Sequence, residues 1–339
     1  MGFVLYLGSR IIRLVVSLIA VSIITFTLLQ LAPGNFADLQ RVSTGATSIG
    51  AAGNEQVAAE LTERYGADVP VWQQYLKFMR GALVWDFGPS YKYASLDVQE
   101  IIASAFPVSA ILAVLAVVLA LLIALPVGVI AALRQNSVVD HASMFVVTLG
   151  HALPSYLTAA FLVLLFTATL HWLPSSGWDG PANLIMPVLA LALGPAAVLA
   201  RYVRASMLET LREEYVTAAL AKGGPYRTVV IRHALRNSLI PLVTVVGPLL
   251  ASLMTGTVFV ETLFRIPGLG LYFATAAASR DMPLLMGTAL FFALILMVVN
   301  LLVDLIYSLL DPRIRAERER KGGRSWRQSK ASTPATARP

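Results

Sequence analysis

The chain has 339 residues, of which 57% are hydrophobic and only 13% charged, and its mean hydropathy is +0.72. Soluble domains carry about a quarter charged residues, so a water-soluble core would not hide this much apolar side chain, and the expected solvent is a lipid bilayer. The net charge of +7 comes from Lys and Arg gathered at loops and termini, which indicates membrane topology and argues against a nucleic-acid partner.

Six apolar blocks are long enough to cross a bilayer, because a hydrocarbon core of about 30 Å needs about 20 helical residues. We expect these helices at residues 11–31, 104–133, 142–169, 183–205, 239–262 and 284–310. The first block is longer than the apolar core of a typical signal peptide, and no clear small-x-small cleavage site follows it. We therefore expect it to be retained as an anchor, and the predicted fold is an all-α integral membrane protein with six transmembrane helices.

The distribution of basic residues predicts that both termini face the cytoplasm. Seven Lys or Arg lie between Arg201 and Arg236 and nine follow Asp311, whereas residues 170–182 contain none and residues 263–283 contain two. Short cytoplasmic loops are enriched in Lys and Arg, so the loop after the fourth block faces the cytoplasm.

The chain then divides into four segments. Residues 1–31 contain the N-terminal cytoplasmic residues and the first transmembrane helix, and residues 32–103 form an external segment with helical spacing over 55–80. Residues 104–310 form a transmembrane core that contains a cytoplasmic loop at 206–238. Residues 311–339 form a basic cytoplasmic tail. The tail has almost no apolar side chains after Ile314. We expect it to be disordered and close to anionic lipid.

The most heavily charged stretch between two apolar blocks is EEYVTAALAKGGPYRTVVIRHALRNSLIP, which starts at Glu213. Its Gly223 and Gly224 predict the end of one helix, and Pro225 suits the first turn of a second, shorter helix. Two short helices joined by a tight turn would project from the membrane surface. The residues alone leave two interpretations open: docking into a groove on a partner, or an amphipathic loop that lies on the headgroups.

This stretch resembles the cytoplasmic coupling loop, often called the EAA loop, of ABC-type import permeases of the dipeptide, oligopeptide and nickel branch. EEYVTAALAKG resembles that branch's pattern EDYVRTARAKG, and RHALRNSLIPLVT matches its continuation. LHWLPSSG (170–177), ETLFRIPGLG (261–270) and NLLVDLIYSLLDPRIR (300–315) resemble further segments of the family. Two residues depart from the pattern: Thr217 stands where the family-wide loop begins with Glu, and Gly224 replaces a common apolar residue, which would loosen the turn.

The resemblance, which covers about residues 8–315, implies a type I ABC importer permease in a bacterial inner membrane. Such a subunit pairs with a paralogous permease, binds ATP-binding cassette subunits on the cytoplasmic side and receives cargo from an extracytoplasmic substrate-binding protein. By this resemblance, the residues that would dock to the ATPase are Glu214, Ala218, Ala219, Gly223 and Arg232.

The same resemblance assigns ATP and magnesium to the partner ATPase subunits. This chain has no G-x-x-x-x-G-K-[ST] loop, so we expect a permease without a cofactor or enzymatic activity of its own. Short peptides are the expected cargo, and nickel chelates and glutathione are alternatives within the family.

The segment ETLFRIPGLG also predicts an external turn formed by Phe264, Pro267 and Gly268. This turn would close the pathway or contact the binding protein, or it would be a re-entrant loop packed on the bundle. The alternative from a different class is a gradient-driven transporter, for which Asp304 is the candidate ionisable residue, although a helix-end Asp is also able to reach the membrane interface. A scaffold protein that has lost transport is a third alternative.

Other site chemistry finds little support in the sequence. The absence of cysteine excludes disulfides, thiolate metal sites and cysteine nucleophiles. The four histidines have no H-E-x-x-H or comparable spacing, so we expect no metal site. No G-x-S-x-G motif is present, which argues against a serine hydrolase.

Overall fold

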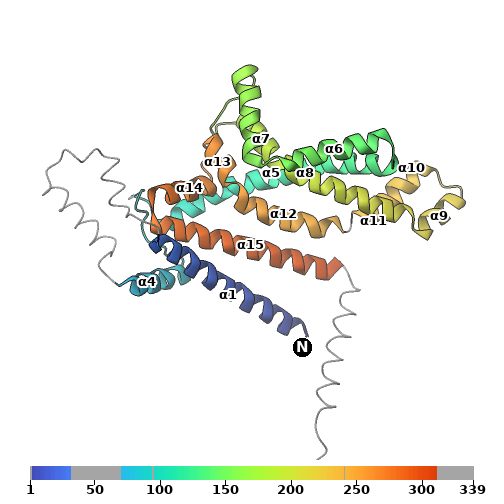
Figure 1. The fold of residues 1–339 in the computed structure, drawn as a ribbon. Coiled ribbons are helices and arrows are strands. Elements are labelled where there is room, and N and C mark those ends of the chain that lie inside the picture. The colour runs from blue at the N-terminus through green and yellow to red at the C-terminus, as the bar shows by residue number, and fades with distance from the viewer. Residues whose placement is uncertain (1, 32–69, 94, 240, 311–339) are drawn as a thin grey trace, which may run out of the picture.

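The computed structural model describes residues 2–31, 70–93, 95–239 and 241–310, which form an elongated helical bundle (Figure 1). Within these residues the only extended pairing is an isolated bridge between Pro89 and Asp97. The prediction of an all-α fold is therefore confirmed. The external residues 55–69 and the tail 311–339 lie outside the described part of the chain.

Four helices are long and apolar enough to cross a membrane, judged by length and composition: α1 (Gly2–Leu31), α5 (Val98–Leu133), α8 (Pro181–Leu211) and α15 (Met282–Leu310). Each contains one of the predicted apolar blocks. The 36 residues of α5 correspond to about 54 Å of helix, more than the hydrocarbon thickness. It begins with a capping box, in which Asp97 and Glu100 satisfy each other's backbone N–H groups.

The other two apolar blocks are each divided into bent helices. In the first, α6 (Val138–Ala152) is followed, after a bend of 99°, by α7 (Ser155–Leu162) and the π-helix η2 (Val163–Thr169). In the second, α12 (Leu242–Gly256) is followed, after a bend of 47°, by α13 (Val258–Phe264). The structure thus contains up to six spans among its described residues, if each bent pair counts as one. Figure 1 shows α7 standing away from the axis of the bundle.

The 99° bend differs from the continuous helix expected over residues 142–169, and its cause is local. Pro154 has no N–H to donate to the helix, and Leu153 before it is extended, with φ −87° and ψ 125°. The Pro154 carbonyl instead accepts bonds from the first turn of α7, including one from the Thr158 hydroxyl at 3.3 Å. A proline inside an apolar run therefore ends one helix and begins another in a new direction.

The centre of the bundle is the contact between α5 and α8, and it is built from small residues. At Gly128 of α5, an added Cβ would lie 2.7 Å from the carbonyl oxygen of Ala200 and 2.7 Å from the Cβ of Val203. Small residues allow two membrane helices to approach closely. The two backbones therefore meet directly, supported by fully buried alanines at positions 116, 120, 192 and 200.

A second buried cluster joins the segment before α5 to α14 (Leu269–Ser279) and to the start of α15. The carboxylate of Asp281, which is fully buried, accepts hydrogen bonds from the hydroxyl of Ser90 at 2.5 Å and from the backbone N–H of Lys92 at 3.0 Å. It also accepts from the N–H of Leu284, at 3.1 Å, in the first turn of α15. One carboxylate thus fixes residues 90–92 to the beginning of α15.

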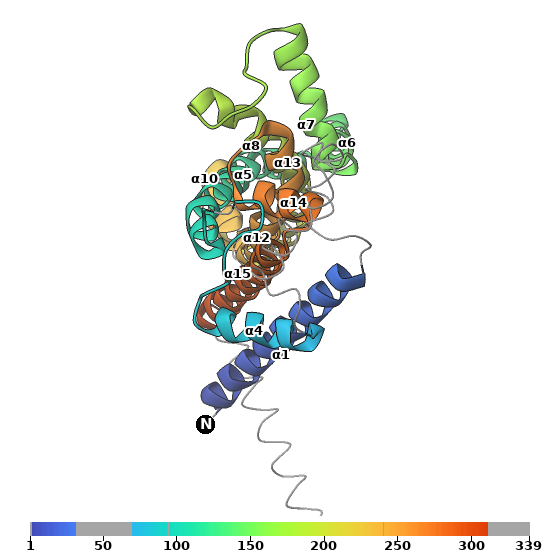
Figure 2. The same cartoon turned by 90° about the vertical axis from the view of Figure 1, so that its left-hand side faces the viewer.

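The helix α4 (Val71–Leu83) lies across α1, as the two views in Figures 1 and 2 show. The hydroxyls of Tyr75 and Ser22 are 2.8 Å apart, and the rings of Phe26 and Tyr75 are separated by 5.2 Å. Helical structure was expected over residues 55–80, and the described part of that segment is helical from Val71 to Leu83.

Candidate functional site

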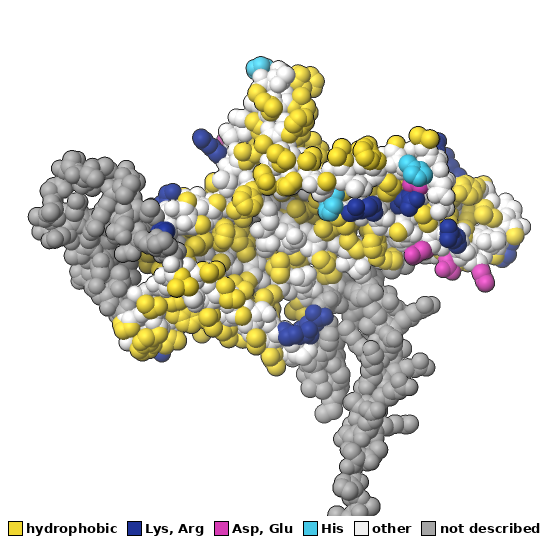
Figure 3. All heavy atoms as spheres, in the orientation of Figure 1, with side chains coloured by type: hydrophobic (Ala, Val, Ile, Leu, Met, Phe, Trp, Pro, Cys, Tyr) yellow, Lys and Arg dark blue, Asp and Glu magenta, His cyan; other side chains and the backbone are white. Residues whose placement is uncertain are grey.

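The candidate site is a helical hairpin between α8 and α12, at one end of the bundle (Figure 1). Figure 3 shows acidic and basic side chains gathered at this end, while much of the rest of the visible face is apolar. We call it the charged hairpin, and it consists of α9 (Glu214–Ala221), α10 (Tyr226–Val229), the π-helix η3 (Val230–Leu235) and α11 (Arg236–Ser238).

The turn of the hairpin depends on two adjacent glycines for different reasons. Gly223 has φ +83°, a left-handed conformation that favours glycine, and a Cβ there would meet no atom within 4 Å. Gly224 has a close neighbour instead, because an added Cβ would lie 3.0 Å from the carbonyl oxygen of Ala219 and 3.2 Å from the Val229 side chain. Gly224 therefore permits close packing of the turn, in contrast to the expectation that it loosens the turn.

The inner face of the hairpin is anchored to the bundle. Val216 is 2% exposed and Ala234 is fully buried. The hydroxyl of Ser206 on α8 donates to the carbonyl oxygen of Ser238 at 2.9 Å, which attaches the end of the hairpin to α8. These contacts hold the hairpin as an extension of α8.

The five predicted docking residues lie on this one hairpin. Glu214, Ala218, Gly223 and Arg232 are exposed, and Ala219 is half-buried beneath the turn. Arg232 lies in η3, and π-helical turns are frequent at functional sites. The structure therefore places four of the five at the protein surface and one in the support of the turn.

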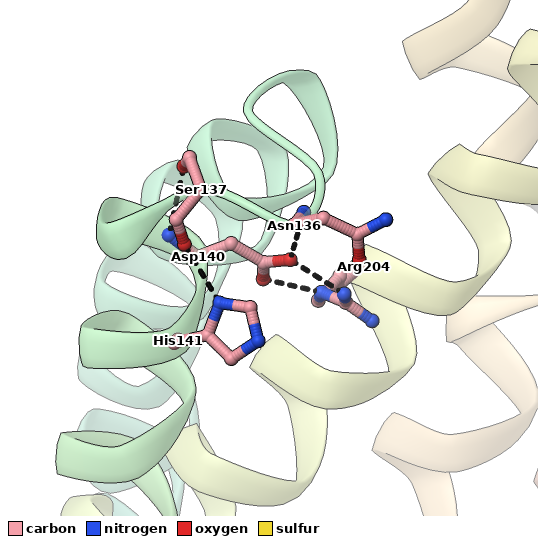
Figure 4. Close-up of polar contacts among 5 residues, drawn as sticks. All are labelled: Asn136, Ser137, Asp140, His141 and Arg204. Carbon is pink, nitrogen blue, oxygen red and sulfur yellow. Dashed lines mark hydrogen bonds and ion pairs between the residues drawn. The ribbon is translucent and has the colours of Figure 1, made fainter.

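An ion pair that the sequence analysis did not identify joins α8 to α6 (Figure 4). Arg204 donates from Nε and a terminal nitrogen to the two carboxylate oxygens of Asp140, both at 2.6 Å. The side chain of Asp140 is 2% exposed and that of Arg204 is 27% exposed. Such a bidentate arrangement fixes the relative orientation of the two helices.

The residues at the N-terminus of α6 also position the Asp140 carboxylate. It accepts from the backbone N–H of Asn136 at 3.0 Å, while the hydroxyl of the N-cap residue Ser137 accepts from the Asp140 N–H at 3.3 Å. The Nδ1 of His141 lies 2.8 Å from the carbonyl oxygen of Ser137. The α5–α6 turn is thereby tied to α8, seven residues before that helix ends at Leu211.

A signal for this pair was present in the sequence. Arg204 lies inside the apolar block predicted at 183–205, and ionisable residues inside membrane helices usually have a specific partner. Asp140 is the first acidic residue after α5, but 64 positions separate it from Arg204. Only the packing of α6 against α8 identifies the two as partners.

The predicted external turn is packed inside the subunit at two of its three residues. Phe264 is 1% exposed and Gly268 is buried, whereas Pro267 is exposed. Beneath them lies Glu261, a fully buried carboxylate that accepts from the Thr257 hydroxyl at 2.5 Å and from the N–H of Leu271 at 3.1 Å.

The glycines of this turn make room for the Glu261 carboxylate. A Cβ at Gly268 would overlap the Glu261 carboxylate, and a Cβ at Gly270 would lie 2.7 Å from the Cα of Val258. The hydroxyl of Ser109 on α5 accepts from the Leu269 N–H at 2.8 Å. The motif therefore forms a clamp between α13, α14 and α5, defined by Glu261, Ser109, Gly268 and Gly270.

Among the described residues no group of three or more His, Asp or Glu is placed to hold a metal ion. The side chain of Asp304, the candidate for gradient coupling, lies outside the described part of α15.

Two family descriptions match nearly the whole chain. The family described as "Binding-protein-dependent transport system inner membrane component" matches residues 124–316, and its N-terminal counterpart matches residues 3–113. The chain is 38% identical over 315 residues to the dipeptide transport system permease protein DppB of Bacillus subtilis (strain 168), covering 93% of this chain and 99% of that protein.

Other relatives agree with these matches. The oligopeptide transport system permease protein OppB of Escherichia coli (strain K12) is 35% identical over 312 residues, covering 91% of this chain and 99% of OppB. A chain of the inward-facing MetNI methionine ABC transporter superposes with a TM-score of 0.50 at 16% identity, covering 62% of this chain and 96% of that one, which supports the fold. The chain therefore belongs to the family of inner membrane components of binding-protein-dependent transport systems.

Proposed function

We propose that the chain is the permease subunit of an ATP-driven importer of short peptides, with six spans and both termini in the cytoplasm. The names of its relatives, which are dipeptide and oligopeptide permeases at 35–38% identity over almost their whole length, support the cargo class. The four long helices, together with the two bent pairs if each is counted as one span, support the count of six. Nickel chelates and glutathione are the cargo alternatives.

The observation that carries the proposal is the charged hairpin. Its sequence resembles the EAA loop, and its exposed face combines Tyr215 and Ile231 with the charges of Glu214, Lys222 and Arg232. A mixed face of this kind fits a groove on an ATP-binding cassette subunit. ATP and magnesium belong to that partner, and a paralogous permease and an extracytoplasmic binding protein complete the assembly.

The Asp140–Arg204 pair connects the hairpin, through α8, to α6. The ATPase would move the hairpin, and the hairpin continues α8 through Ser206 and Ser238. Because Arg204 holds α6 through two charge-assisted hydrogen bonds, α6 would follow α8. Closure of the ATPases would in this way change the arrangement of the spans.

The test is an affinity pull-down from native membranes that compares wild type with Gly223→Val. We expect an ATP-binding cassette subunit and a second permease to co-purify with wild type, and the ATPase to be lost from the variant. Valine at φ +83° is strained, and no neighbouring atom lies within 4 Å of the added Cβ, so the effect is confined to the exposed turn. Gly8→Val is the control, because Gly8 also has open space around it.

The outcomes separate the candidate functions. Normal association of the ATPase with Gly223→Val would contradict the docking role of this turn. If no ATPase co-purifies with wild type, a gradient-driven transporter becomes the better candidate and Asp304→Asn should then abolish uptake. Uptake of labelled dipeptides that depends on ATP would favour peptides over nickel chelates and glutathione, and partner binding without uptake of any cargo would indicate a scaffold.

A further inference from the structure

The helix α4 carries three stripes of side chains that differ in chemistry, because residues three, four or seven positions apart share a helix face. One stripe faces the protein: Tyr75 packs on Phe26 of α1, and the rings of Phe78 and Phe87 are 6.0 Å apart. The second stripe is apolar and exposed, and its members are Trp72 (62% exposed), Leu76 (43%) and Leu83 (83%). The third stripe is polar and exposed, and its members are Gln73, Lys77 and Arg80. The apolar and polar stripes are centred about 90° apart around the helix.

Contacts near both ends of α4 fix which stripes face outward. Near its start, the hydroxyl of Tyr75 is bonded to that of Ser22 on α1. Directly after its end, the ring of Trp85 makes an edge-to-face contact with Phe291 of α15, with 5.8 Å between the ring centroids. Turning the apolar stripe toward the protein would break these contacts, so the stripe stays exposed.

The position of α4 along α1 gives its depth in the membrane. The apolar block of α1 covers residues 11–31, and the sequence APGN follows it. α4 crosses α1 near the end of this block, where the Tyr75 ring lies against Phe26 and the amide groups of Gln74 and Gln30 are 3.5 Å apart (Figures 1 and 2). At 1.5 Å per residue the crossing lies within about 8 Å of the end of the block. An amphipathic helix at a membrane surface buries its apolar face to a depth of about 5–10 Å, so α4 lies at the boundary between headgroups and acyl chains.

The chemistry of the exposed stripes favours lipid over a soluble partner. At the level of the crossing, α1 also exposes the apolar side chains of Ile24 and Leu28, so the environment at this level is apolar. Tryptophan is enriched at membrane interfaces because its ring is apolar and its N–H is polar. Lys and Arg lay their apolar stems along such a surface and extend their charges toward the phosphates, and α4 has two basic residues and no acidic one. A soluble partner would leave the apolar stripe in water whenever it dissociated, whereas lipid covers it continuously.

We propose that α4 lies in the plane of the membrane as an interfacial helix, with its apolar stripe in the acyl-chain boundary. Lys77 and Arg80 lie at the level of the lipid phosphates, and Gln73 faces water. The helix is then a flat anchor that sets the height at which the segment before α5 enters the bundle. The choice of the external leaflet rests on the proposed orientation, but the contact with lipid does not.

Spin labels on single cysteines test this arrangement, because the chain has no cysteine of its own. Leu76→Cys and Lys77→Cys are a matched pair, since they are neighbours on α4, both exposed, and belong to different stripes. Each full-length variant is labelled and reconstituted, without any partner, in vesicles of phosphatidylethanolamine and phosphatidylglycerol. Power-saturation electron paramagnetic resonance then measures collisions with oxygen, which concentrates among acyl chains, and with a nickel chelate, which stays in water. We expect the ratio of oxygen to nickel accessibility to be about tenfold higher at position 76 than at position 77.

Two further labels calibrate the measurement. Ile24→Cys is exposed on a membrane-spanning helix and reports acyl chains, whereas Gln135→Cys is exposed in the α5–α6 turn and reports water. Melting temperatures identify any variant that fails to fold. Fluorescence provides a second measurement without cysteine: lipids brominated near the ester carbonyl should quench the wild type more than lipids brominated at the chain ends, and Trp72→Phe should lose part of this difference.

Two results would overturn the proposal. Equal access of the nickel chelate to positions 76 and 77 would place both stripes in water, as expected of a surface that waits for a soluble binding protein. Protection of position 76 from both reagents would show that protein covers the apolar stripe. Neither result bears on the ATPase pull-down, so failure of this inference and failure of the proposed function are distinguishable.

Discussion

At the residue scale, the molecule places a small number of charged side chains in its interior and gives each one specific partners. Asp140 is paired with Arg204, Glu261 is bonded to a hydroxyl and a backbone N–H, and Asp281 accepts three hydrogen bonds. Burying a charge without such partners costs far more than burying a hydrogen-bonded one. These carboxylates therefore fix positions where helices meet.

The Asp140–Arg204 pair is expected to couple energetically. Asp140→Ala should destabilise the protein by about 3 kcal/mol, because it leaves a partly buried guanidinium without its counter-charge. In the double variant Asp140→Ala/Arg204→Ala the loss should be smaller than the sum of the single losses by about 2 kcal/mol. Thermal unfolding in detergent, followed by fluorescence, measures all three variants.

The control for this double-mutant cycle combines Asp140→Ala with Arg80→Ala, because Arg80 is exposed on α4. Those two changes should be additive. Additive losses at Asp140 and Arg204 would show that the pair does not join α6 to α8 energetically.

At the element scale, the bent pairs and the clamp around Glu261 define where helices begin and end. The clamp depends on close approach. The N–H of Leu271, in the first turn of α14, donates to the buried Glu261 carboxylate, and no space remains for a Cβ at Gly268 or Gly270. This explains why the segment ETLFRIPGLG carries two glycines after its proline. It also explains why Phe264 faces the interior.

Gly270→Ala is expected to disrupt this clamp. The added methyl group would lie 2.7 Å from the backbone of Val258, which is not able to rotate away as a flexible side chain would. Overpacking of this kind costs about 1–3 kcal/mol, and the melting temperature and the yield of folded protein should fall.

Gly256→Ala is the matched control, because a Cβ there meets no atom within 4 Å. It should be neutral or slightly stabilising, since alanine favours a helix by roughly 0.5–1 kcal/mol relative to glycine. A melting temperature for Gly270→Ala equal to that of Gly256→Ala would contradict the close contact between α13 and α14.

Much of this element order follows from the sequence, and the exceptions have physical reasons. Apolar length predicts α1, α5, α8 and α15, and the pair of glycines predicts the turn at Gly223. Apolar length does not reveal a change of direction, so the bend at Pro154 was not expected even though the proline was visible. The pairing of Asp140 with Arg204 depends on helices that are distant in sequence, and no local pattern encodes it.

At the scale of the whole molecule, the charged hairpin and the junction of α14 with α15, where Asp281 lies, are at opposite ends of one elongated bundle (Figure 1). The proposed orientation places the hairpin and the α5–α6 turn in the cytoplasm, with residues 170–180 outside. The chain has no cysteine, so single cysteines introduced at chosen positions report this arrangement directly.

We expect Ser175→Cys to react with a membrane-impermeant maleimide in intact spheroplasts, and Gln135→Cys to react only after the membrane is made permeable. Both side chains are exposed in the structure, so a difference in labelling reflects the membrane and not burial. The cysteine-free wild type is the blank. Labelling of Gln135→Cys in intact spheroplasts would reverse the proposed topology.

The attachment of Ser90 and Lys92 to Asp281 has a consequence for motion. These contacts sit at the first turn of α15, whose 29 residues span about 43 Å. If α15 pivots there as a rigid rod, a tilt of about 5° moves its far end by about 4 Å over this length. Val303, near that end, packs against Gly247 of α12. A small rearrangement of the segment before α5 would thus be transmitted along α15 to the contacts that this helix makes with α12 and α1.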